Sequence, residues 1–157
     1  MSNRAARAGT PRLGRSDALF AGTALLIQFV LVVFFALRTW FFDTAMELGW
    51  VVYALVVPAV LVSLVLIRSG RPWYLWIAGF LYASWAAFGY YVDVASPVEW
   101  RAPILWPVLV PYVVLYLGAQ MFYWFPLGRL GPLGRRLWFV FAVLFVTSTG
   151  LNLASHG

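Results

Sequence analysis

The stretch ALFAGTALLIQFVLVVFFAL, residues 18–37, runs for twenty residues without one charged side chain. The hydrocarbon core of a bilayer is about 30 Å thick, and about 20 apolar residues in an α-helix cross it. Four further stretches share this character and also lack Asp, Glu, Lys and Arg: 50–67, 73–92, 103–125 and 137–155. The sequence therefore predicts an all-α integral membrane protein, a single transmembrane bundle of five helices over 18–155.

The composition of the whole chain agrees with this fold class. Hydrophobic residues make up 64% of the 157 residues and charged residues only 10%, whereas a soluble domain is about half apolar and about one quarter charged. A soluble fold of this length could not bury so much apolar surface. The net charge of +6 comes in short blocks between apolar stretches, so it indicates topology rather than a nucleic-acid partner, and the lipid bilayer is the first expected partner.

All eleven basic residues are arginine, and their positions predict the orientation. With a basic cytoplasmic tail at 1–17, nine of them fall on cytoplasmic segments: Arg4, Arg7, Arg12, Arg15, Arg68, Arg71, Arg129, Arg135 and Arg136. Short cytoplasmic loops are enriched in Lys and Arg. We therefore expect a multi-pass protein of the inner (cytoplasmic) membrane, with the N-terminus inside, the C-terminus outside and the first span as an uncleaved anchor.

Tryptophan gives an independent indication of five spans. Eight of the nine tryptophans fall at one of the two expected membrane boundaries, where indole side chains are enriched. Only Trp85 falls in the middle of a span.

Missing residue types exclude several functions. Without lysine there is no Schiff base for retinal or a pyridoxal cofactor. With no cysteine, and His156 as the only histidine, thiol chemistry, paired-histidine haem ligation and histidine-dependent hydrolysis have no residues to use. We expect no catalytic residue, no metal site and no cofactor, and favour a non-enzymatic function over an enzymatic one.

The expected outer loops hold four of the five acidic residues: Asp43, Glu47, Asp93 and Glu99. Asp43 and Glu47 are four residues apart, so a short interfacial helix at 39–48, ending at Gly49, would place both on one face. A cluster of the four carboxylates would be able to do acid–base work or hold a cation. The sequence favours solvated loop charges, because nothing places these acids inside the membrane.

Few polar residues lie within the spans. Gln28 sits in the middle of the first span, and Ser148 and Asn152 are four residues apart in the last span, on one helix face. Such side chains usually form hydrogen bonds between transmembrane helices, so we interpret them as structural.

Span 73–92 carries small residues at four-residue spacing, Gly79, Ala83 and Ala87. Small residues at this interval let helices approach closely, which predicts that this span is the central helix of the bundle. Aromatic residues of this span and the next would offer a stacking surface to a flat apolar ligand, and packing inside the bundle is the competing interpretation. These candidate ligand-binding residues are Tyr82, Trp85, Tyr112 and Tyr116.

Two short motifs resemble a known family. LVPY at 109–112 and TGLN at 149–152 are similar to fragments of the last helix of the translocator-protein family, the tryptophan-rich sensory proteins, which the chain resembles in its five-span format. In this chain the two motifs fall in different spans, and residues 38–50 lack the proline of that family's motif after the first helix. The resemblance implies a similar format and transfers no site residue.

Three functions remain open from the sequence. The first is an accessory or structural subunit that docks other membrane proteins or self-associates, because the loops are short and catalytic groups are missing. The second is a binder or carrier of an apolar ligand of the tetrapyrrole, carotenoid, quinone or sterol-like kind. The third is an outer-leaflet lipid-modifying enzyme that uses the loop carboxylates.

Overall fold

A computed structural model describes residues 13–96 and 103–154, and this part of the chain is helical, without strands. The elements in chain order are α1 (Arg15–Trp40), α2 (Phe42–Leu48), α3 (Trp50–Ala54), α4 (Val56–Arg68), α5 (Trp73–Tyr90), the π-helical turn η1 (Tyr91–Ala95), α6 (Trp106–Leu127) and α7 (Gly131–Ala154). Five helical stretches are long and apolar enough to cross a membrane: Arg15–Trp40, Phe42–Arg68, Trp73–Ala95, Trp106–Leu127 and Gly131–Ala154. The prediction of five spans in an all-α protein is confirmed.

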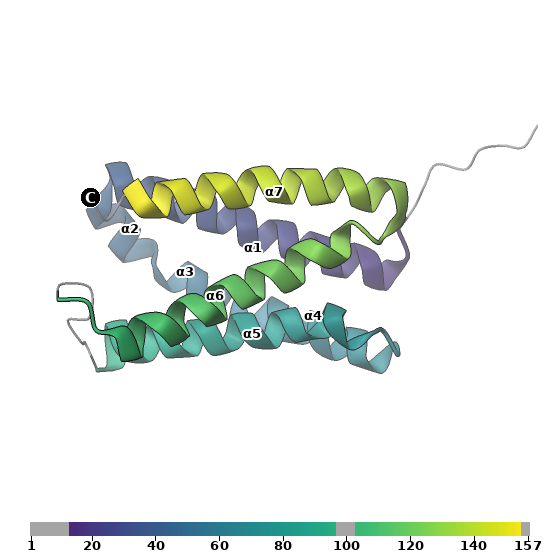
Figure 1. Cartoon of the computed structure of the whole chain (residues 1–157), viewed down its shortest axis with the longest axis horizontal. Coiled ribbons are helices and arrows are strands. Elements are labelled where there is room, and N and C mark those ends of the chain that lie inside the picture. Colours follow the sequence, from purple (N-terminus) through teal and green to yellow (C-terminus); the bar gives the residue numbers. More distant parts are fainter. Residues whose placement is uncertain (1–12, 97–102, 155–157) are drawn as a thin grey trace, which may run out of the picture.

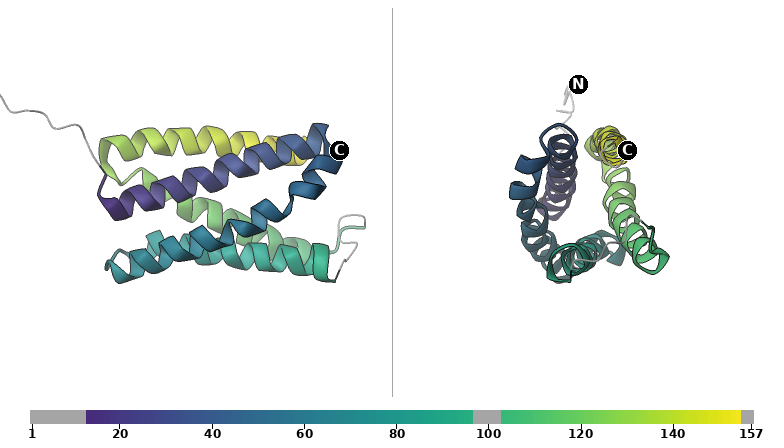
Figure 2. Two further views of the ribbon diagram at one scale, coloured as in Figure 1. Left: turned by 180° about the vertical axis from the view of Figure 1, so that it is seen from behind. Right: turned by 90° about the vertical axis from the view of Figure 1, so that its left-hand side faces the viewer.

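The five spans form a ring (Figures 1 and 2). In chain order, α1 packs on α4, α4 on α5, α5 on α6, and α6 on α7, and α7 returns to pack along α1. No span runs through the middle, which the end-on view in Figure 2 shows directly. The expectation that span 73–92 is the central helix is therefore wrong, because α5 is one member of the ring, held between α4 and α6.

The expectation that the small residues of α5 mediate close helix contacts is only partly correct. Gly79 is buried, Ala83 is half-buried and Ala87 is exposed. The face of α5 that turns inward carries larger residues, including the fully buried Tyr82 and the nearly buried Trp85. The four-residue spacing identified one close approach and not a continuous contact.

That close approach lies between α5 and α4. A Cβ atom added at Gly79 would lie only 2.3 Å from the Ala59 carbonyl oxygen and 2.2 Å from Ser63 Oγ. Only the missing side chain of glycine lets the two helices come this near, as in other membrane helix pairs with small contact residues.

Where the ring closes, one buried hydrogen bond joins the neighbouring first and last spans. The Gln28 amide Nε2 donates to Ser148 Oγ at 2.6 Å, and both side chains are fully buried. The interpretation of this pair as structural is supported by the bond, which links α1 to α7.

The second span is broken into three helical pieces, α2, α3 and α4. Pro58 has no N–H to donate to the carbonyl of Ala54, and its ring crowds that carbonyl. Helix α3 accordingly ends at Ala54, and α4 begins after the single residue Leu55. The short helix expected at 39–48 is present as α2, but Gly49 has helical φ and ψ angles and connects α2 to α3 directly.

The two ends of the bundle differ in charge. The basic end, where α1 and α7 begin, carries six described arginines: Arg15, Arg68, Arg71, Arg129, Arg135 and Arg136. The acidic end, where α5 ends and α6 begins, carries Asp43, Glu47 and Asp93 together with Arg38.

Candidate functional site

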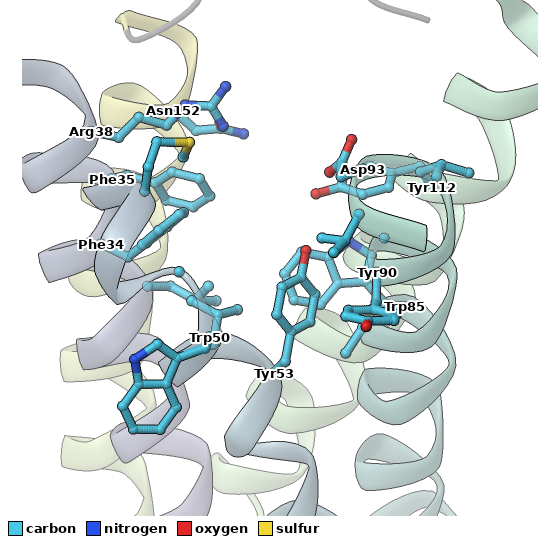
Figure 3. Close-up of a pocket in the computed structure, with 18 of the residues that line it drawn as sticks. Phe34, Phe35, Arg38, Trp50, Tyr53, Trp85, Tyr90, Asp93, Tyr112 and Asn152 are labelled. Atoms are coloured by element: carbon cyan, nitrogen blue, oxygen red, sulfur yellow. The ribbon is translucent and has the colours of Figure 1, made fainter. Parts of the chain in front are cut away.

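A cavity of about 800 Å³ lies inside the ring at the acidic end. Side chains from all five spans line it, because the ring leaves its axis unfilled there and the broken second span turns α2 and α3 along its edge. The aromatic and polar lining residues labelled in Figure 3 are Phe34, Phe35, Arg38, Trp50, Tyr53, Trp85, Tyr90, Asp93, Tyr112 and Asn152.

Aromatic rings make up much of the cavity wall. Trp85 lies in the cavity lining, and its ring centroid is 5.7 Å from that of Tyr112 in an edge-on arrangement. Tyr53 and Tyr90 form a second edge-on pair at 5.7 Å. Each pair joins two different helices, so the rings brace one another in orientations that favour aromatic contacts.

Trp85 is the lining residue with an unused polar group. Its side chain is 5% exposed, and its indole Nε1 has no hydrogen-bond partner among the described residues. A buried indole N–H usually has an acceptor. Although other atoms of Trp85 line the cavity, the Nε1 atom itself is buried and does not open into it.

Charged and polar groups lie near the top of the cavity in Figure 3. Arg38 and Asn152 are on one wall, from α1 and α7, and Asp93 and Tyr112 are on the facing wall, from η1 and α6. Asp93 points inward because the chain takes a π-helical turn over Tyr91–Ala95, and π-turns of this kind occur frequently at functional sites. The cavity therefore combines an apolar aromatic interior with a polar, charged rim.

The four aromatic residues singled out from the sequence fall into two groups. Trp85 and Tyr112 line the cavity. Tyr82 and Tyr116 lie behind Trp85, with ring centroids 5.5 and 5.4 Å from it. The Tyr82 hydroxyl donates to the Val52 carbonyl oxygen at 2.7 Å, which ties α5 to the short helix α3 in the cavity wall.

Of the four acidic residues of the expected outer loops, the three that the structure describes do not all line one site. Asp93 lines the cavity, whereas Asp43 and Glu47 on α2 are exposed and do not line it. Glu99 lies outside the described residues. Within 13–96 and 103–154, no three Asp, Glu, His or Cys side chains come together in a way that suits a metal ion.

Several residues that line the cavity were not predicted from the sequence. Tyr53, Tyr90 and the pair Phe34 and Phe35 carried no distinguishing signal among so many aromatic residues. Arg38 carried one, because it is the only arginine of the described chain at the acidic end. Asn152 was noted in the sequence, but as a structural residue.

Comparison with known proteins gives no relative: no family model, no curated protein and no solved structure matches the chain.

Proposed function

We propose that this membrane protein binds an amphipathic small molecule in the cavity at the acidic end. The ligand has a flat apolar body and a polar or charged head group. Tetrapyrroles, quinones and sterol-like molecules combine these features. The observation that carries the proposal is the cavity of about 800 Å³ with aromatic walls and a rim of Arg38, Asp93 and Asn152.

The size and lining of the cavity suit a ligand of this class. Small-molecule sites are commonly about 300–1,000 Å³, mostly apolar, with a few placed polar groups that fix orientation. The faces of Trp85 and Tyr53 would stack on a planar body.

The rim selects the head group. Arg38 presents a planar guanidinium that suits a carboxylate or phosphate, and Asp93 on the facing wall suits a hydroxyl or a cation. A ligand with both kinds of group would bridge the two walls. Because both charged groups lie at the rim, the site would also orient the ligand with its head group at the rim and its apolar body toward the middle of the bundle.

We further propose that this cavity faces the outer side of an inner (cytoplasmic) membrane, with the N-terminus in the cytoplasm, and the arginine distribution supports this orientation. Alkaline-phosphatase fusions test this orientation. We expect activity for a fusion after residue 157 and none for a fusion after residue 70. The reverse pattern would mean that the orientation in the membrane is opposite to the one proposed.

The other two functions remain predictions, and the geometry favours them less. An accessory subunit needs no internal cavity, although a ligand-binding protein can also dock a partner. A lipid-modifying enzyme built on the outer carboxylates would need them close together. Among the described acids only Asp93 reaches the cavity.

The test is retention of a bound molecule after purification in mild detergent. We expect mass spectrometry of the extracted protein to identify one enriched small molecule at near-stoichiometric amounts. Two adjacent tyrosines give a matched pair of variants, because Tyr90 lines the cavity and Tyr91 does not. The two side chains are similarly exposed, at 50% for Tyr90 and 59% for Tyr91.

Tyr90→Ala is expected to lower the bound amount about tenfold, because it removes one face of the aromatic wall, worth about 1–2 kcal/mol of stacking and burial. Tyr91→Ala should leave the bound amount unchanged. Equal retention in both variants, or no enriched molecule in the unmodified protein, would remove the cavity as a binding site.

A further inference from the structure

A second hollow lies at the opposite, basic end of the bundle, between the start of α5 and the end of α6. Its volume is about 360 Å³, and it shares no residue with the cavity at the acidic end. The residues that matter here are Trp73 and Tyr74 on α5, Met121, Phe122 and Phe125 on α6, and Arg129 in the turn after α6.

The lining of the hollow follows the last turns of α6. Met121 and Phe125 are one helical turn apart on the same side of the helix, which corresponds to a rise of about 6 Å at 1.5 Å per residue. Arg129 lies in the turn two residues beyond the end of α6 at Leu127. The apolar trough formed by these residues therefore has a single positive charge at one end, an arrangement that suits a lipid chain under its head group.

Arg129 is held in place at the end of this trough. Its backbone N–H donates to the Pro126 carbonyl at 3.0 Å in a tight turn, and its guanidinium carbon lies 5.6 Å from the centroid of the Tyr74 ring. A guanidinium kept on an aromatic face by a cation–π interaction retains its in-plane N–H donors for an acceptor.

The charge of Arg129 is not balanced by the protein. Within 13–96 and 103–154, the ion pair of the basic end joins Arg71 to Asp17, and no carboxylate pairs with Arg129. The apolar floor of the trough is also uncovered, since Trp73 is 59% exposed and Phe125 62%. Both the positive charge and the apolar surface are therefore available to bind a molecule from the membrane.

We infer that this trough binds an anionic phospholipid, with one acyl chain along Phe122 and Phe125 and its phosphate on Arg129. Charge complementarity selects the anionic class, because a guanidinium pairs with phosphate through two parallel N–H···O bonds. Basic pockets between transmembrane helices at a membrane surface recognise such head groups. Trp73 at the start of α5 would flank the glycerol region, where indole side chains are favoured.

The test is lipid binding to the delipidated full-length protein in detergent micelles, followed by native mass spectrometry with dioleoyl-phosphatidylglycerol or dioleoyl-phosphatidylcholine. We expect phosphatidylglycerol to bind at least tenfold more tightly. Arg129→Gln should lower its affinity about tenfold, the usual size of a lost charge-assisted bond, and leave phosphatidylcholine binding unchanged. Arg129→Lys should fall in between, because lysine keeps the charge without the planar fork.

The matched control is Arg136→Gln, since Arg136 is an exposed arginine of the same end that does not line the trough. It should keep the full preference. Phe125→Ala should weaken both lipids, because it removes the apolar floor and not the charge. The inference is overturned if Arg129→Gln and Arg136→Gln lower phosphatidylglycerol binding equally, which would indicate a diffuse surface charge. Displacement of the lipid by millimolar inorganic phosphate would overturn it too, because the trough would then be a site for the free anion.

Discussion

The two ends of the bundle close in different ways. At the basic end, the α6–α7 turn is tight. Trp124 and Trp138 stack with ring centroids 4.9 Å apart, and a Cβ added at Gly134 would lie 2.4 Å from the Leu127 carbonyl oxygen. The Arg71–Asp17 ion pair joins the α4–α5 turn to α1. At the acidic end the walls stand apart around about 800 Å³, and the second span breaks at Leu55.

The difference shows how a ring of helices makes a cavity without an added domain. Small residues and short turns bring neighbouring helices together below the cavity. Above it, a proline break lets α2 and α3 leave the line of α4, so the interior is not filled by a straight helix. The predictions below test whether the cavity depends on the contacts beneath it, from the largest expected effect to the smallest.

The largest effect should come from Gly79→Ala. The new methyl group would meet the Ala59 carbonyl oxygen and Ser63 Oγ at less than 3 Å, so α4 and α5 would have to move apart. Overpacking of this kind costs about 1–3 kcal/mol and sometimes more. Thermal unfolding in detergent measures it.

The control for this change is Gly22→Ala, since nothing lies within 4 Å of a Cβ at that position on α1. There the added methyl group should stabilise the helix by up to about 1 kcal/mol. A Gly79→Ala protein with an unchanged melting temperature would show that the close α4–α5 approach does not hold the ring together.

A moderate effect is expected from Tyr82→Phe. This change removes the hydrogen bond from Tyr82 to the Val52 carbonyl, inside a fully buried site, and should lower the free energy of unfolding by about 1–1.5 kcal/mol. It should also weaken ligand retention, because Val52 belongs to α3 in the cavity wall.

Tyr123→Phe is the matched control. Tyr123 is 2% exposed, and its hydroxyl has no hydrogen-bond partner among the described residues. Loss of that hydroxyl should leave stability unchanged or raise it slightly. Equal destabilisation by both substitutions would indicate that the α3–α5 bond adds nothing beyond burial of the ring.

The smallest effect concerns the hydrogen bond between Gln28 and Ser148. Ser148→Ala leaves the buried Gln28 amide without this acceptor, and side-chain bonds between membrane helices average about 0.6 kcal/mol. The double variant Gln28→Leu with Ser148→Ala should be more stable than Ser148→Ala alone, because both polar partners are then gone. A double variant less stable than the single one would mean that Gln28 has a second role.

The sequence was sufficient for the number of spans and for part of the cavity. Span length and the lack of charge indicate five helices directly, and Trp85 drew notice because its position in mid-membrane differs from that of the other tryptophans. Tyr112, which the sequence analysis also named as a candidate ligand-binding residue, lines the cavity beside Trp85.

The direction in which each helix faces was not predictable, for a physical reason. In a membrane span both the lipid-facing and the protein-facing sides are apolar, so the pattern of residues does not show which side turns inward. Ala86 is 2% exposed and Ala87 is exposed, although the two are chemically identical. The facing of Arg38 and Asp93 across the cavity depends on the rotation of α1 and on the π-turn at the end of α5, and neither has a signature in the sequence.

The closure of the ring by its first and last spans has a consequence for biosynthesis. Gln28 and Ser148 are 120 residues apart in the chain, and translation proceeds at about 5–20 residues per second, so roughly 6–24 s separate the synthesis of the two. During that interval α1 is in the membrane without its principal neighbour, and the side-chain amide of Gln28 has only lipid, the insertion machinery or the three intervening spans to contact. Insertion of α7 is therefore the step that closes the ring, and a ribosome stalled before Gly131 would leave the first four spans as an open ring.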